Sequence, residues 1–264
     1  MLSISLREYL DRPIPDLSTE RIRRKGSRMH PIDLDSSQNA ERAIDARLHG
    51  LRGENYYHRA DNPPYWHCAP GAIPELYVRE GILSRLLAAN EIFRGMGFEL
   101  FLYDAYRPVE VQNYFHDTWV PAYLRRKFPE WSDERVREET GNYWARGVSA
   151  ADEIDPLSPP PHATGAVIDL TLFNMRLGGE LFMGAHFDEV SEISHTDHFE
   201  RLAMTRPLLM SEEIAQMNRR LLYWVMTEAG FTVNPNEWWH FGLGDQLSAK
   251  IAGLPHAVYS VLRI

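Results

Sequence analysis

Residues 161–172 read Pro-His-Ala-Thr-Gly-Ala-Val-Ile-Asp-Leu-Thr-Leu. The apolar, β-branched second half of this stretch predicts a central strand, which a single acid, Asp169, interrupts. A buried carboxylate costs several kcal/mol, so Asp169 needs either a bound metal or an arginine partner. A fully extended chain would separate His162 from Asp169 by about 23 Å, whereas ligands of one zinc lie only about 2 Å from it. If both residues bind one metal, the chain must bend back between them, and Gly165 has the freedom for that bend.

A second cluster of polar residues occupies 234–241, Asn-Pro-Asn-Glu-Trp-Trp-His-Phe. The Asn-Pro-Asn sequence predicts a turn, with Glu237 at the start of a strand and His240 further along it. Residues three apart on a regular strand face opposite sides, so both can reach one site only if the turn distorts the first position. Taken alone, this cluster is equally compatible with a hydrogen-bonded pair in the core.

Considered together, the two clusters contain two histidines and one carboxylate, with a glutamate nearby. Three ligands with a fourth position left for water are the open arrangement of a catalytic zinc, and a glutamate that is not a ligand can act as the base of a hydrolase. The HExxH helix of common zinc proteases is absent, as are a G-x-S-x-G elbow and a phosphate-binding loop. The lone cysteine, Cys68, is expected to be a small buried residue.

The surrounding pattern mixes helices and strands without regular alternation, which predicts an α+β fold and disfavours a doubly wound sheet. We expect strands at 99–103, 166–172, 231–233 and 238–241. Helices are expected from about Glu75 to the glycines at 95 and 97, from Pro108 through Trp119, after a Ser132 cap, and from a Ser211 cap to Gly230.

Length and composition exclude several classes of protein. The 264 residues are 44% hydrophobic and 25% charged, as in an ordinary globular protein, and the net charge of -9 disfavours nucleic-acid binding. No stretch predicts a signal peptide or a membrane span, so we expect a soluble, cytoplasmic protein without a membrane partner. Residues 1–50 are polar and charged, typical of an arm that wraps the domain, is partly disordered or binds a partner, and residues 51–264 form the domain. No pattern indicates an oligomeric state.

Four motifs carry a resemblance to a known family: YDAYRP at 103–108, PHATGAVIDLTL at 161–172, MGAHFDEVSEISH at 183–195 and EWWHF at 237–241. In order and spacing they resemble the VanX-type D-alanyl-D-alanine dipeptidases, part of a zinc DD-peptidase group that includes D,D-carboxypeptidases and resembles the hedgehog signalling domain. The resemblance implies a hedgehog/DD-peptidase-like α+β fold, with a small, mostly antiparallel sheet and flanking helices. The sequence departs from the family pattern at Pro160-Pro161, which precede the first histidine.

The resemblance also implies roles for individual residues. One zinc ion per chain would be bound by three ligands, His162, Asp169 and His240. Glu237 corresponds to the general base and acid, and Arg107 to the arginine that stabilises the developing oxyanion. Asp188 and Asp104 are similar to acids near the substrate, where a carboxylate would pair with the free ammonium of a dipeptide. The alternatives are that Asp188 lies in a surface turn and that Arg107 only pairs with Asp104.

We therefore expect zinc-dependent hydrolysis of D-Ala-D-Ala, or of a related small dipeptide, with Glu237 as general base. Two alternatives remain open: a zinc D,D-carboxypeptidase that acts on peptidoglycan peptides, and a non-catalytic zinc-binding module on the same fold. The presence of both Glu237 and Arg107 favours catalysis.

Overall fold

A small mixed sheet lies at the centre of the computed structural model, which describes residues 5–144, 147–148 and 153–264. The strand order is β2-β4-β5-β8-β7, and β6 pairs with β5. The β2–β4 pairing is parallel, whereas β4–β5, β5–β6, β5–β8 and β7–β8 are antiparallel. A separate antiparallel pair joins β1 and β3. The strands are β1 Ala43–Asp45, β2 Arg52–Gly53, β3 Tyr77–Arg79, β4 Phe98–Asp104, β5 Val167–Asn174, β6 Gly179–Glu180, β7 Thr232–Val233 and β8 His240–Gly242.

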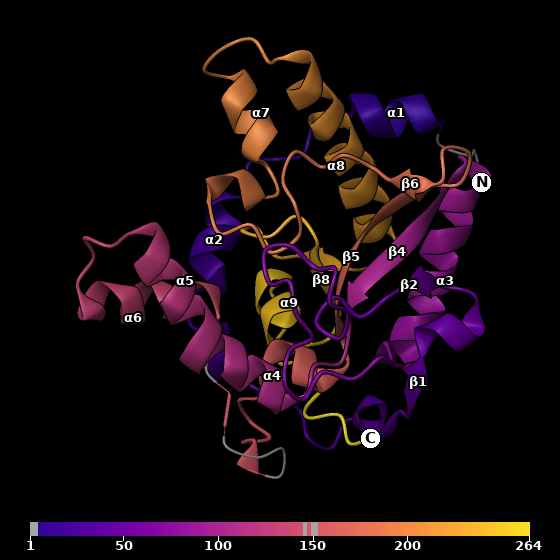
Figure 1. Ribbon diagram of the computed structural model, residues 1–264. Helices are drawn as coiled ribbons and strands as arrows, with labels where there is room; N and C mark the ends of the chain where they lie inside the picture. Colours follow the sequence, from indigo (N-terminus) through magenta and orange to yellow (C-terminus); the bar gives the residue numbers. More distant parts are fainter. Residues whose placement is uncertain (1–4, 145–146, 149–152) are drawn as a thin grey trace.

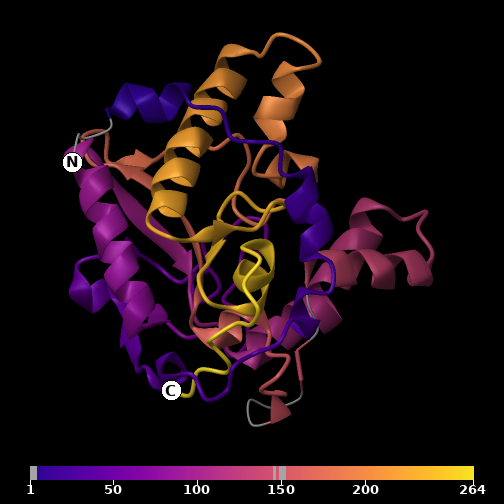
Figure 2. The same cartoon turned by 180° about the vertical axis from the view of Figure 1, so that it is seen from behind.

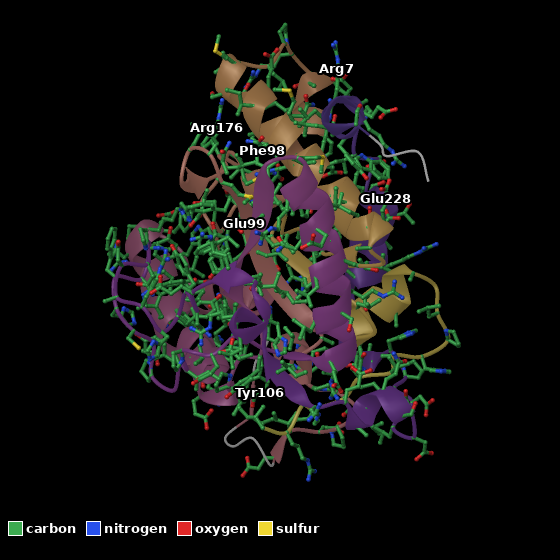
Figure 3. All side chains as sticks on the ribbon, turned by 90° about the vertical axis from the view of Figure 1, so that its right-hand side faces the viewer. Arg7, Phe98, Glu99, Tyr106, Arg176 and Glu228 are labelled. Atoms are coloured by element: carbon green, nitrogen blue, oxygen red, sulfur yellow. The ribbon has the colours of Figure 1, made fainter. Side chains whose placement is uncertain are left out.

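Helices flank this sheet, and two of them, α5 and α6, stand away from it on one side in both Figure 1 and Figure 2. Helix α3 packs over the sheet through buried residues that include Leu86 and Phe93, in the same core as Leu100 of β4. Figure 3 shows α3 in front of the sheet, with Phe98 and Tyr106 toward opposite ends of β4. The predicted α+β fold with a small, mostly antiparallel sheet is confirmed. The helices are α1 Leu6–Asp11, α2 Ser18–Arg24, α3 Glu80–Gly95, α4 Val109–Tyr114, α5 Val120–Lys127, α6 Asp133–Tyr143, α7 His198–Ala203, α8 Met210–Glu228 and α9 Gln246–Ile251, with a π-helical turn Phe115–Trp119 between α4 and α5.

Local details correct three predictions. Helix α3 begins at Glu80, later than expected, because the preceding residues form β3 and pair with β1. The cap of α8 is not Ser211: the helix begins at Met210, and the Glu212 carboxylate accepts the backbone N–H of Leu209 at 2.8 Å. Cys68 is exposed and not buried. By contrast, the Ser132 cap of α6 is confirmed, since its hydroxyl accepts the backbone N–H of Arg135 at 3.2 Å.

The N-terminal segment, described here from residue 5 to residue 50, runs along the surface of the rest of the chain (Figure 2). Three of its residues, Tyr9, Ile14 and Leu17, are buried in the main hydrophobic core. Arg12 forms an ion pair of 2.8 Å with Glu228 at the end of α8. Across residues 5–144, 147–148 and 153–264, no helix combines the length and the apolar character that crossing a membrane requires.

Candidate active site

Strand register aligns three of the predicted site residues in one row across the sheet. Asp104 at the end of β4 pairs with Asp169 on β5, and Asp169 pairs in turn with His240 on β8. The register shifts between Leu102 and Asp104, as at a β-bulge, which redirects a side chain at a strand end. The acid that interrupts the apolar strand is therefore flanked on both sides by polar neighbours.

His162 joins this row from a short 3-10 turn, Pro161–Thr164. The turn ends at Gly165, whose φ of +66° lies in the left-handed region, and a side chain there would collide with Leu262. This is the bend that two ligands so close in sequence require. His162 Nδ1 donates to the Ala105 carbonyl at 2.8 Å, which leaves Nε2 as the nitrogen able to bind a metal.

The cluster fits a divalent metal. His162, Asp169 and His240 are buried, and each offers one ligand atom within 4.8 Å of the other two. Asp169 Oδ1 is buried and makes no hydrogen bond with any described residue, although it lies 3.2 Å from Nδ1 of His240. Leaving a buried carboxylate oxygen without a hydrogen bond is costly, and a cation bound by this carboxylate and the two imidazoles would satisfy it. Two imidazoles and one carboxylate are a donor set that suits zinc.

Charges within the cluster keep Asp169 ionised, as a ligand must be. Burial acts to raise the pKa of Asp169, but the adjacent imidazoles of His162 and His240 outweigh it and hold that pKa well below its usual range. Burial likewise opposes charge on His240, yet the carboxylates of Asp169 and Glu237 raise its pKa above the ordinary value. The site therefore attracts positive charge.

Glu237 lies beside the cluster, in the turn before β8. Its Oε2 accepts Nδ2 of Asn234 at 2.8 Å and lies 3.2 Å from Nδ1 of His240. The prediction that Glu237 starts a strand at 238–241 is wrong, because β8 begins only at His240 and Glu237 lies in the preceding turn. This turn brings both side chains to one site. The Glu237 side chain is 21% exposed and lines a cavity, so it is accessible to water in a way that a core pair is not.

Arg107 follows β4, lines the cavity and is oriented by hydrogen bonds to several described residues. Its Nε donates to Asp104 Oδ2 at 2.8 Å, and Nη1 donates to Gln112 Oε1 at 3.1 Å. Its Nη2 donates to the Tyr57 hydroxyl at 3.1 Å and to Asp169 Oδ2 at 3.2 Å. Asp104 is 0% exposed and is not among the residues that line the cavity. The structure thus places Asp104 behind Arg107, away from the space that a substrate could enter.

Asp188 lies at the cavity wall in a positive-φ conformation, with a φ of +59°. Its Oδ2 accepts the hydroxyls of Tyr57 and Tyr65, each at 2.7 Å. Burial, and next the Asp169 carboxylate, raise the pKa of Asp188 to about 7, although Arg107 and the two tyrosines oppose the shift. Non-glycine residues in this conformation are uncommon and cluster at functional sites.

The cavity that these residues share has a volume of about 780 Å³, within the usual range for small-molecule sites. Sequence reasoning missed Tyr57, Tyr65 and Gln112 as parts of the site. The aromatic density of residues 55–74 was a signal, since it predicts an ordered loop, and Gln112 lies only five residues after Arg107. Sequence reasoning also gave no reason to bring the basic run at 21–28 to this cavity, yet most of that run lines it.

Comparison with known proteins agrees with these observations. The family profile described as D-Ala-D-Ala dipeptidase, peptidase M15, matches residues 47–259. A D-alanyl-D-alanine dipeptidase of Synechocystis sp. is 31% identical over 254 residues, covering 92% of this chain and 90% of its own. The enzyme of the same name from Enterococcus faecium is 26% identical over 206 residues, covering 77% and 91%.

Among solved structures, the vancomycin-resistance D,D-pentapeptidase VanY in complex with Zn(II) overlaps 68% of this chain and 82% of its own, at 14% identity and a TM-score of 0.38. That overlap is too weak to support an inference. The family match over most of the chain and the relative of 31% identity are sufficient: this protein belongs to the D-Ala-D-Ala dipeptidase family of M15 peptidases.

Proposed function

We propose that this protein hydrolyses D-Ala-D-Ala, or a closely related small dipeptide, with one zinc ion per chain bound by His162, Asp169 and His240. The observation that carries the proposal is the buried cluster of His162, Asp169 and His240, whose ligand atoms lie within 4.8 Å of one another beside a cavity that Glu237 also lines. The names of the relatives supply the substrate class.

Glu237 is the proposed general base and acid. Zinc bound in such a site lowers the pKa of water and polarises a carbonyl group. The Glu237 carboxylate accepts a proton from the attacking water and afterwards delivers it to the departing amine. Its hydrogen bond from Asn234 fixes one carboxylate oxygen, and the partial exposure of the side chain leaves it accessible to water.

Arg107 is the proposed donor to the carbonyl oxygen on which charge develops. A guanidinium cannot lose its proton at neutral pH, and in a site with little water such a donor stabilises the transition state strongly. Asp104 and Gln112 fix its orientation. We assign Asp104 to this positioning role in place of contact with the substrate.

Asp188 is the proposed partner of the substrate ammonium. Tyr57 and Tyr65 hold its carboxylate at the cavity wall. An N-acylated peptide has no ammonium to offer and would leave Asp188 unpaired, which selects against longer chains. This distinguishes a dipeptidase from a D,D-carboxypeptidase.

We also propose the cytoplasm as location, a hedgehog/DD-peptidase-like arrangement of the fold, and a division into an arm at 1–50 and a domain at 51–264. The family profile begins at residue 47, which supports that boundary. The single cysteine, which cannot form an internal disulfide, fits the reducing setting of the cytoplasm.

A dipeptide panel with metal analysis of the same sample tests the function. We expect one zinc per chain, release of D-alanine from D-Ala-D-Ala, loss of that activity on chelation, and no hydrolysis of the N-acylated dipeptide. Efficient release of D-alanine from the acylated form would instead indicate a carboxypeptidase. Bound zinc without hydrolysis of any dipeptide would indicate a binding module.

A further inference from the structure

The N-terminal segment contributes a basic wall to the active-site cavity. Arg21 and Arg24 lie three residues apart on α2, and therefore on one face of the helix, and both line the cavity. Lys25 and Arg28 extend the same wall. Arg23 does not line the cavity, and its Nη1 donates to the Ile251 carbonyl of α9 at 3.1 Å.

This wall is attached to the rest of the chain on both sides. On the side of α7, the backbone N–H of Leu17 donates to Asp197 at 3.2 Å and that of Ile14 donates to Glu200 at 3.2 Å. On the side of α9, Gln246 donates to the Arg28 carbonyl at 2.9 Å. Figure 2 shows α2 beside α9. The cations are therefore presented by an anchored element.

The charge of the wall is only partly neutralised. Arg21 forms an ion pair with the fully buried Asp197, which Arg201 also contacts at 3.3 Å, so two guanidinium groups share one carboxylate. Arg21 Nε is buried and makes no hydrogen bond with a described residue. Arg24 is half-buried, and its side chain makes no hydrogen bond or ion pair with any part of the chain that the structure describes. Both observations indicate that this wall accepts an anion.

The wall and Asp188 lie on different sides of the metal cluster. Asp188 accepts a hydrogen bond from the Tyr57 hydroxyl, which in turn accepts one from Arg107 beside β4. Arg21 lies on the other side, because its partner Asp197 follows Thr196, which is hydrogen-bonded to the turn before β8 that carries Glu237. The Thr196 N–H donates to the Pro235 carbonyl at 3.2 Å, and the Thr196 hydroxyl donates to the Asn234 carbonyl at 2.9 Å. The sheet order β4-β5-β8 puts Asp169 between these two sides.

A dipeptide is a zwitterion, with an ammonium at one end and a carboxylate at the other. With its ammonium at Asp188 and its scissile carbonyl at the metal cluster, its carboxylate would lie toward α2. Pro160 and Pro161, directly before His162, have no N–H to donate to that carboxylate. We propose that Arg24, with Arg21 beside it, binds the C-terminal carboxylate of the substrate. This subsite rests on the proposed function and adds the N-terminal segment to the active site.

The test compares D-Ala-D-Ala with its C-terminal amide, which lacks the carboxylate, in the zinc-loaded full-length protein. In R24M we expect KM for the free acid to rise about 10- to 100-fold, the size of one charge-assisted hydrogen bond, with kcat largely retained. Hydrolysis of the amide should change less than about twofold, because it makes no such bond. R24K should be intermediate, because lysine keeps the charge but not the fork of donors.

The matched control is R23M, which removes the same charge from the same helix outside the cavity and should leave both substrates unaffected. An R24M variant with wild-type KM for the acid, an equal effect on acid and amide, or an R23M variant that behaves like R24M would each overturn the subsite while the proposed function stands. A wild-type protein that hydrolyses neither substrate would overturn the proposed function and the subsite with it.

Discussion

Replacing Glu237 with glutamine changes the proposed base while altering little else. The glutamine amide oxygen can still accept the hydrogen bond from Asn234, which is 2.8 Å in the native protein. That bond falls from a charge-assisted to a neutral one, a loss of about 1 kcal/mol at most for a partly exposed group. A general base contributes about 10²- to 10⁴-fold to the rate. We therefore expect kcat to fall by that factor in E237Q with little loss of stability.

The assay measures release of D-alanine from D-Ala-D-Ala, zinc content and the thermal midpoint on one preparation. Zinc should remain at one per chain, because Glu237 is not a proposed ligand, and the midpoint should fall by only about 2–4 °C. E192Q is the control, since Glu192 also lines the cavity but is exposed, and its turnover should match the wild type. Unchanged turnover in E237Q would refute its role as base, and loss of zinc would make it a ligand.

Three other perturbations probe the rest of the site. D188N should raise KM for D-Ala-D-Ala at least about 10-fold with a smaller effect on kcat, because it removes the charge that pairs with the ammonium; equal KM values would contradict this. In the metal-free protein the raised pKa of Asp188, about 7, exceeds the ordinary pKa that this residue has in the unfolded chain. The free energy of unfolding of the wild type, measured in urea, should therefore fall relative to that of D188N as the pH rises from 5 to 7; a parallel pH dependence would refute that. D104N breaks a fully buried ion pair with Arg107 and should cost about 3–5 kcal/mol in the free energy of unfolding, with a lower kcat; native kcat would exclude positioning. Chelation should abolish turnover and lower the thermal midpoint, both restored by zinc; turnover that survives complete metal removal would contradict the proposed chemistry.

The residues of the cluster that fits a metal could be found from the sequence because the segment that contains His162 and Asp169 has a recognisable local pattern. Asp169 interrupts an apolar strand, and Gly165 permits the bend that returns His162 to it. What the sequence alone could not supply is the register that pairs Asp169 with His240, because that pairing joins strands 71 positions apart. The family resemblance supplied the connection.

Other features depended on tertiary contacts that no periodicity reveals. Helix α3 begins later than predicted because Tyr77–Arg79 pairs as a strand with residues 43–45, which belong to the polar N-terminal region. The family resemblance placed Asp104 among acids near the substrate, and only the fold shows it fully buried against Arg107. The sequence predicts only a polar, charged arm at residues 1–50, and the structure places the basic face of α2 along the cavity wall.

The most direct measurement is the anomalous diffraction of the zinc-loaded crystal at the zinc edge. The account predicts one peak per chain, about 2.0–2.2 Å from a nitrogen of His162, an oxygen of Asp169 and a nitrogen of His240. A peak bound by other residues, or zinc that leaves any of these three side chains outside coordinating distance, would contradict it.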